Sequence, residues 1–248
     1  MDKKFESLYH HLEETGWWFV KRREIIHQLI QESHISKVNA ILEIGCSSGV
    51  FLSELRQRHY TDCKGIDISP EAIEACHKRG LLNTYLMNGV NPDFDKKSIN
   101  LIIASDVLEH IKEDEIALRN WYSLLKPNGK LILFVPAFPI LWSSHDVANH
   151  HFRRHTKKGL FSLLNRSGFH ILRLSYWNSA LFFPILFSRL FLKLFPNDGT
   201  ARHQLIPLPS FFNAILSEIL NIENRLLRVI NFPIGVSLFA VAERGGDE

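Results

Sequence analysis

The 248-residue chain contains 46% hydrophobic and 22% charged residues, a balance that predicts a packed globular core and excludes a disordered polar chain. Its formal net charge of +3 is small for a protein dedicated to nucleic acid, so no nucleic-acid partner is expected. The three cysteines (Cys46, Cys63 and Cys76) form no CxxC pair, which disfavours a disulfide framework and a zinc site and favours a reducing, cytoplasmic compartment.

Residues 3–33 carry apolar side chains at helical spacing, interrupted by the sequence GWWF at 16–19. We interpret residues 1–35 as an N-terminal helical lid. The charged start of this segment has no apolar signal-peptide region, so no secretory signal is expected. No stretch reaches 18 apolar residues without charges, so the sequence predicts no membrane-spanning helix.

Seven segments have the composition of strands, and most are separated by helical patterns. The predicted strands are residues 40–45, 63–67, 82–87, 99–105, 130–135, 169–177 and 235–243. The predicted helices are residues 49–58, 70–79, a segment that follows DVLEHI and ends near Leu125, and 156–167. Alternating strands and helices predict an α/β fold with a parallel sheet and right-handed crossovers.

The stretch ILEIGCSSG at 41–49 joins the first strand to its helix through small residues. Small residues let a ligand approach the backbone closely, and a helix N-terminus offers free N–H groups. Glu43 lies at the end of this strand and Asp67 at the end of the next one. A carboxylate at such a strand end can accept hydrogen bonds from both hydroxyls of a ribose. The sequence therefore predicts a nucleoside-binding site at this edge of the sheet.

After Pro136 the pattern changes to a long connection that contains four histidines and two arginines. A connection of this length in a compact domain is usually functional. Residues 178–232 then form an insertion between the sixth and seventh strands, helical by pattern and divided by prolines. No repeat or low-complexity segment is present.

The motifs EIGCSSG (43–49), GIDIS (65–69), SDVLEHI (105–111) and KPNGKLILFVP (126–136) resemble those of class I S-adenosylmethionine-dependent methyltransferases. Residues 141–160 are similar to a subset of these enzymes with an HD…HxRR signature after strand five. The resemblance implies one methyltransferase domain over residues 1–248. It also implies a Rossmann-like seven-stranded sheet of order 3-2-1-4-5-7-6, with its last strand antiparallel.

The resemblance also implies a binding site for S-adenosyl-L-methionine. Its expected residues are Glu43, Gly45, Cys46, Ser47, Gly49, Asp67, Ile68, Asn88, Gly89, Ser105 and Asp106. The Glu43–Gly49 turn would surround the amino-acid part of the cofactor. Asp67 would hold the ribose hydroxyls, and Ile68 would lie against the adenine. Ser105 and Asp106 would lie beside the methionine part. Two positions depart from the family pattern. Ser47 replaces a glycine, and Asn88 with Gly89 replaces an acidic residue that would contact the adenine amino group.

Methyl transfer requires a positioned acceptor and, for oxygen or nitrogen acceptors, a base; histidine is the usual choice. The candidate catalytic residues are His110, His145, Asp146, His151 and Arg154, with Asp146 as a carboxylate that would orient a His145 base. The alternatives are that His110 packs the following helix and that His145 and Asp146 belong to a loop hydrogen-bond network. The basic residues of 150–155 would either bind an acidic acceptor or form a solvated face. The histidines lack a specific ligand spacing, so no metal site is expected.

Residues 180–195, ALFFPILFSRLFLKLF, are apolar except for Arg189 and Lys193. They form a core-facing helix, line an apolar acceptor pocket or contact a membrane surface. We expect residues 178–232 to cover the acceptor side and the acceptor to be a small, partly apolar molecule. Two functional alternatives are a catalytically silent cofactor-binding subunit and a nicotinamide-dependent oxidoreductase. The sequence does not indicate an oligomeric state.

Overall fold

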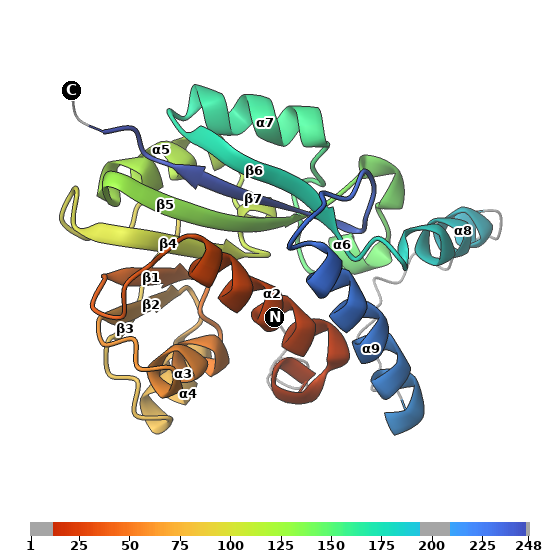
Figure 1. Ribbon diagram of the computed structural model, residues 1–248, viewed down its shortest axis with the longest axis horizontal. Helices are drawn as coiled ribbons and strands as arrows, with labels where there is room; N and C mark the ends of the chain where they lie inside the picture. Colours follow the sequence, from red (N-terminus) through yellow and green to blue (C-terminus); the bar gives the residue numbers. More distant parts are fainter. Residues whose placement is uncertain (1–11, 194–208, 247–248) are drawn as a thin grey trace.

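The computed structural model describes residues 12–193 and 209–246, which form a seven-stranded sheet with helices on both faces (Figure 1). The strands are β1 Ile41–Ile44, β2 Cys63–Asp67, β3 Thr84–Leu86, β4 Ile99–Ser105, β5 Leu125–Pro136, β6 His170–Trp177 and β7 Ser237–Glu243. Their order is β3-β2-β1-β4-β5-β7-β6, with β7 antiparallel to both neighbours and the other pairs parallel. The fold class and strand order predicted from the sequence are confirmed.

The described helices cover the sheet in two layers. They are α2 Trp17–Glu32, α3 Val50–Gln57, α4 Pro70–Lys78, η1 Leu108–His110, α5 Asp114–Leu124, η2 Pro139–Leu141, α6 Ser144–Ala148, α7 Lys157–Arg166, α8 Phe182–Lys193 and α9 Ser210–Leu226. Helices α2, α3, α4 and α9 pack on one face of the sheet, whereas α5 and α7 pack on the other (Figure 1). β4 lies between the two layers and is apolar almost throughout, as expected for a strand covered on both faces.

The structure departs from the sequence prediction mainly at turns. The KPNG segment was expected to separate a helix from strand five, but β5 already begins at Leu125. The turn is absorbed as an irregularity in the β4–β5 register, where Ile99 pairs with Leu125 and Leu101 with Lys130. Asn128 adopts a left-handed φ of 60° at this point. The connection after β5 also contains two short helices, η2 and α6. The sequence did not predict them, because they are too short to show a helical periodicity of apolar residues.

The predicted lid and insertion lie only partly within the described residues: 1–11 and 194–208, including Phe195, lie outside them. α2 is a structural layer, because its Ile25, Leu29 and Ile30 are buried against the sheet. α9 runs beside α2, and the Asn224 side-chain amide donates to the Lys21 carbonyl at 3.0 Å. Two described parts of the lid reach predicted site residues: Glu13, in the segment before α2, and Arg22 of α2.

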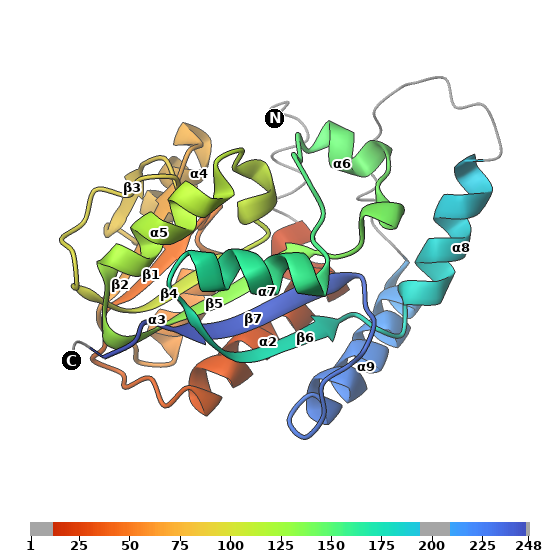
Figure 2. The same ribbon diagram turned by 90° about the horizontal axis from the view of Figure 1, so that it is seen from above.

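Helices α8 and α9 project beyond the end of the sheet toward which β4 and β5 point (Figure 2). Most of their aromatic side chains are exposed and do not fill the core. The exposed phenylalanines are Phe183, Phe187, Phe191, Phe211 and Phe212. Phe182 is the buried exception and contacts Phe138. Among the described residues, no helix is long and apolar enough to cross a membrane.

Candidate active site

The turn after β1 is held open by residues with left-handed backbone. Gly45, Ser47 and Gly49 have φ values of 75°, 48° and 78°. The N–H groups of Gly45 and Cys46 both donate to the Ile66 carbonyl, at 2.8 and 3.0 Å, which ties the turn to β2. Gly49 is the N-cap residue of α3. The turn therefore presents backbone, unobstructed by bulky side chains, at the C-terminal ends of β1 and β2.

Gly45 cannot accept a side chain without strain. A Cβ atom there would lie 2.4 Å from Cγ2 of Val107, in addition to the unfavourable φ. We expect Gly45→Ala to lower the free energy of unfolding by about 1–3 kcal/mol, measured by urea denaturation. Gly245→Ala is the matched control, because a Cβ at Gly245 meets open space, and it should change stability by less than about 0.5 kcal/mol. Equal effects of the two changes would contradict this prediction.

Three carboxylates surround the turn. Glu43 is buried, and its Oε2 has no hydrogen-bond partner among the described residues. Burial, reinforced by the nearby Glu13, raises the pKa of Glu43 well above its ordinary value. The Asp67 carboxylate accepts from the backbone N–H groups of Ser47 and Ser69, both at 2.9 Å. This arrangement places two acidic side chains at neighbouring strand ends, as the sequence predicted.

Glu13 is a site residue that the sequence analysis missed. Its Oε2 accepts hydrogen bonds from the hydroxyls of Ser47 and Ser48, each at 2.9 Å. The segment before α2 thus lies against the glycine-rich turn. No local signal distinguishes Glu13 from the other charged residues of the N-terminus, because the contact is made across more than 30 residues of chain.

The remaining predicted cofactor residues differ in what they offer. Cys46 is buried, and its hydrogen bond with Cys76 together with burial raises the pKa of its thiol, so only its backbone is available. Ile68 is 74% exposed directly beside Asp67. The Asn88 side-chain oxygen accepts from the Val90 N–H at 2.8 Å, so this oxygen is already engaged in its own turn. Gly89 passes close to β1: a Cβ there would lie 3.0 Å from the Ile44 side chain.

Ser105 and Asp106 end β4 and are fixed by a buried arginine from α2. Arg22 Nη1 donates to Asp106 Oδ2 at 2.9 Å and to Ser105 Oγ at 3.3 Å. Asp106 itself has a left-handed φ of 57°. The sequence motifs did not indicate Arg22 either, because it lies in the charged run KRRE at 21–24, where nothing distinguishes it from Lys21 and Arg23.

The predicted acceptor loop folds back onto the end of β4. The Phe152 N–H donates to the Glu109 carbonyl at 2.8 Å, and the His155 N–H donates to the Pro136 carbonyl at 2.9 Å. These bonds place α6 and residues 149–155 over η1, beside the Ser105–Asp106 strand end. Candidate residues that are 40 positions apart in the sequence therefore meet.

Asp146 is the centre of this loop, but its partner is not the adjacent histidine. Its Oδ1 accepts from His151 Nδ1 at 2.9 Å and from Arg154 Nε at 2.7 Å, and its Oδ2 caps the α6 N-terminus through the Ser143 N–H. Asp146 is fully buried. The His145 ring instead lies 3.2 Å from Asn149 Nδ2, and among the described residues it forms no hydrogen bond with the Asp146 carboxylate, so the predicted pairing is not formed. The alternative of a loop hydrogen-bond network therefore describes Asp146, whose bonds join His151, Arg154 and Ser143.

The imidazoles at this end of the sheet are biased toward the neutral form. His110 keeps part of its surface in solvent, but partial desolvation of its ring, together with the neighbouring His151, lowers its pKa to about 4. Burial lowers the pKa of His145 and His155 to about 4 as well. Arg153 is engaged elsewhere, in a salt bridge with Asp114. Within 150–155, Arg153 and Arg154 are thus each paired with a carboxylate and the pKa of His155 is lowered, so this stretch does not form a continuous cationic face.

The residues around the turn fit the cofactor that the sequence resemblance implies. S-adenosylmethionine carries an ammonium and a sulfonium group, and the buried Glu43 carboxyl with its partnerless Oε2 is suited to a cationic ligand. The positive-φ turn exposes backbone where a ligand chain can approach, and Asp67 with the exposed Ile68 offers a carboxylate beside an apolar surface.

Comparison with known proteins supports this interpretation. Ubiquinone biosynthesis O-methyltransferase of Schizosaccharomyces pombe is 28% identical over 119 residues, which are 45% of this chain and 43% of that mitochondrial protein. The Coxiella burnetii protein of the same name is 26% identical over 107 residues, 41% of this chain and 45% of that protein. The matches thus span less than half the length of these curated relatives.

Solved methyltransferase structures share the fold at low sequence identity. A methyltransferase from Archaeoglobus fulgidus superposes with a TM-score of 0.59 at 16% identity, over 96% of this chain and 99% of that one. Phosphoethanolamine N-methyltransferase 2 of Haemonchus contortus, in complex with S-adenosylmethionine, superposes with a TM-score of 0.60 at 15% identity. The superposition covers 90% of this chain and 52% of that one. A family model described as a methyltransferase domain matches residues 11–174, well over half of the chain. On this match the chain belongs to the methyltransferase domain family, with the sheet order of its class I members.

Proposed function

We propose that this chain transfers a methyl group from S-adenosylmethionine to an oxygen or nitrogen atom of a small, partly apolar acceptor. The observation that carries the proposal is the pair of strand-end carboxylates, Glu43 and Asp67, on either side of the positive-φ turn. The family match favours this chemistry over a nicotinamide-dependent oxidoreductase.

In this proposal the chain's own residues divide into a cofactor side and an acceptor side. Glu43 and the Gly45–Gly49 turn hold the amino-acid part of the donor, and Asp67 holds the ribose. Ser105 and Asp106, fixed by Arg22, hold the donor beside the loop of α6. Bound S-adenosylmethionine supplies a methyl carbon that is electrophilic because it is attached to a sulfonium.

The acceptor side supplies neutral proton acceptors. The acceptor atom forms a bond to the methyl carbon as the bond between that carbon and sulfur breaks. The electron pair of the broken bond stays on sulfur. The acceptor atom then has to lose its proton. His110 and His145, with pKa values lowered to about 4, are neutral at pH 7, so they do not repel the cationic donor, and they pass the acceptor's proton on to solvent and do not retain it. Arg154 is neutralised by Asp146, so it adds no net repulsion at this end of the sheet.

The apolar character of the acceptor is supported by α8 and α9. Phe183 and Phe187 of α8 are 53% and 65% exposed, and η2 and Phe138 connect α8 to the acceptor loop through Phe182. Arg189 of α8 lies near enough to Arg154 and Asp146 for their charges to affect its pKa, which burial lowers. The helices therefore offer an apolar surface next to the ionisable cluster. Contact of residues 180–193 with a membrane surface remains a prediction for vesicle binding experiments.

Replacing the Asp67 charge should weaken donor binding strongly. We expect Asp67→Asn to lower affinity for S-adenosylhomocysteine by about 1–3 kcal/mol, or roughly 5–150-fold, because charge-assisted hydrogen bonds to the ribose are lost. Isothermal titration calorimetry measures this directly. Asp62→Asn is the matched control, because Asp62 lies at the opposite end of β2 and pairs with Lys64. The affinity of this variant for S-adenosylhomocysteine should equal that of the wild type.

The transfer itself is tested by the donor's conversion to S-adenosylhomocysteine in the presence of small hydroxylated or aminated aromatic compounds. Turnover with one acceptor class identifies the attacking atom. Wild-type protein that binds no S-adenosylmethionine, or that binds NAD more tightly, would overturn the proposal. Donor binding without turnover for any acceptor would favour the catalytically silent alternative.

A further inference from the structure

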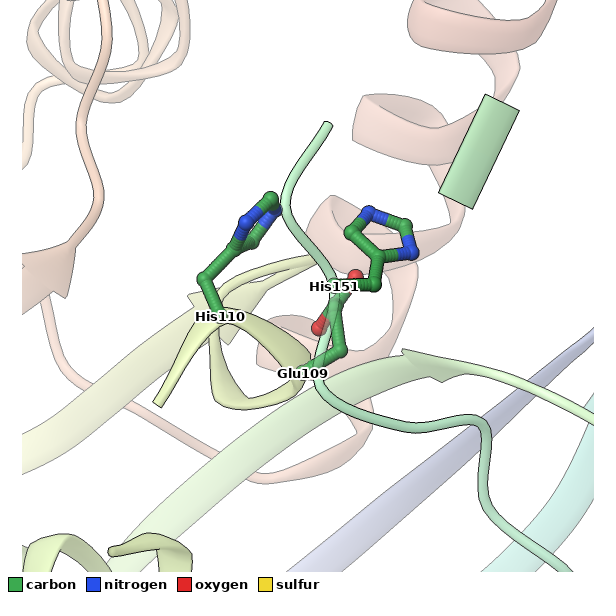
Figure 3. A group of neighbouring side chains, drawn as sticks. All are labelled: Glu109, His110 and His151. Carbon is green, nitrogen blue, oxygen red and sulfur yellow. The ribbon is translucent and has the colours of Figure 1, made fainter. Parts of the chain in front are cut away.

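We propose that Glu109, His110 and His151 form a binding site for a first-row divalent cation such as Zn²⁺. The sequence predicts no metal site, because these residues show no ligand spacing along the chain. The fold supplies the missing proximity: η1 contributes two of the side chains, and the connection after α6 brings the third (Figure 3).

The three side chains are close enough for one ion. One ligand atom from each residue lies within 4.8 Å of the other two. A triangle with sides of 4.8 Å has its centre about 2.8 Å from each corner, whereas Zn–N and Zn–O bonds are about 2.0–2.2 Å. Each ligand atom therefore needs to move less than about 1 Å, which a change in side-chain torsion angle provides.

The Glu109 side chain is buried, and one of its two carboxylate oxygens lacks a hydrogen-bond partner. It is 1% exposed, and its Oε2 makes no hydrogen bond with any described residue. A buried carboxylate without a hydrogen bond or a cation is costly. A bound cation would satisfy the oxygen and stabilise the ionised form.

Both histidines already have the outer hydrogen bonds that metal-binding imidazoles require. His151 Nδ1 donates to Asp146 Oδ1 at 2.9 Å, which leaves Nε2 with a free lone pair. Arg154 and Ser143 hold Asp146 in turn. The His110 ring is hydrogen-bonded to the Asn149 backbone. A metal-ligating histidine typically donates its second ring N–H to a carboxylate or a backbone carbonyl, which fixes its tautomer and orientation.

The donor set selects the type of cation. Two imidazole nitrogens and one carboxylate oxygen suit Zn²⁺ and its first-row neighbours better than Ca²⁺ or Mg²⁺, which prefer oxygen ligands. Three protein ligands leave at least one coordination position open, as in catalytic zinc sites. Since η1 directly follows the Ser105–Asp106 strand end, the three side chains lie on the side that the proposed function assigns to the acceptor.

A cation at this place would act as a Lewis acid on an acceptor hydroxyl and lower the pKa of that hydroxyl. His110 and His151 would then be ligands, and His145 would remain as the proton acceptor. This role rests on the proposed function; the binding of the cation does not. The two are therefore measured separately.

The test is a titration of chelator-treated, full-length protein with Zn²⁺ by calorimetry, and with Co²⁺ by visible absorption. We expect one site per chain, with affinity reduced at least tenfold in Glu109→Gln and in His110→Ala. His110 is exposed, so its replacement is compatible with the folded state even if Glu109→Gln unfolds the protein. Asp146→Asn should weaken Zn²⁺ binding by about 10–100-fold through the lost orientation of His151.

His170→Ala is the control, because His170 is 72% exposed and pairs with Glu243 at the far end of β6. Binding to this variant should match wild type. No Zn²⁺ binding to wild type, or equal binding to wild type and His110→Ala, would overturn the site. Calorimetry with S-adenosylhomocysteine in the same samples separates the outcomes, because loss of donor binding with Zn²⁺ retained contradicts only the proposed function.

Discussion

Asp146→Ala is expected to lower the free energy of unfolding by about 3–5 kcal/mol, because it leaves two cationic or hydrogen-bonding partners buried without their acceptor. Asp146 is fully buried, and Arg154 has a side chain that is 6% exposed. Burial alone would raise the pKa of Asp146, yet the hydrogen bonds from His151 and Arg154 hold it well below its usual range. The carboxylate is therefore ionised in the folded protein, and its removal leaves the buried Arg154 without an oppositely charged partner.

The measurement is urea denaturation of both proteins at neutral pH in the presence of a chelator. The chelator excludes a contribution from bound cations. Asp114→Ala is a matched control, because Asp114 also pairs with an arginine of the same loop, Arg153, whose side chain is 32% exposed. That change should cost less than about 1 kcal/mol. Similar losses in the two variants would show that Asp146 is no more important than a surface ion pair.

The sequence predicted the parts of the fold that depend on local pattern. Strands β2 and β4 have the bounds that the sequence predicted, and the glycine-rich turn lies where small residues follow the first strand. The strand order followed from the family resemblance and is confirmed by the pairing of β7 with β5 and β6.

The parts that could not be predicted depend on contacts between distant residues. Asp146 was expected to assist its neighbour His145, but a helical turn directs adjacent side chains apart, and residue 151 meets Asp146 only because the chain reverses after α6. The role of Glu109 could not be predicted for a related reason. Its motif, DVLEHI, identified the strand end, but nothing in the local pattern shows that the glutamate points inward while His110 stays exposed.

Arg22 shows the same limit in the opposite layer of the molecule. Periodicity identifies α2 as a helix with an apolar face, and a charged residue in such a helix is usually assigned to solvent. In the structure the Arg22 guanidinium lies 4.3–4.4 Å from the ring centroids of Trp18, Phe134 and Trp177. It also donates to the Ser237 hydroxyl at 2.9 Å, so one side chain connects α2 with β4, β5 and β7.

We therefore expect Arg22→Met to destabilise the protein by about 3 kcal/mol or more, and to weaken donor binding as well. Methionine retains much of the apolar contact, but it loses the cation–π interactions and leaves Asp106 without its salt-bridge partner at 2.9 Å. Asp106 is 27% exposed, so solvent recovers part of the loss. The donor effect follows because Ser105 and Asp106 would no longer be held in place at the end of β4.

The neighbouring Lys21 provides the control for this prediction. Lys21 pairs with Glu24 within α2, and the Glu24 side chain is 42% exposed, so Lys21→Met should change stability by less than about 1 kcal/mol. Urea denaturation gives the stability of each variant, and calorimetry with S-adenosylhomocysteine gives the donor affinity. If Arg22→Met lowers stability while donor affinity remains at the wild-type value, the arginine braces the core without positioning the cofactor site. If neither quantity changes, the buried guanidinium contributes no more than the methylene groups that methionine preserves.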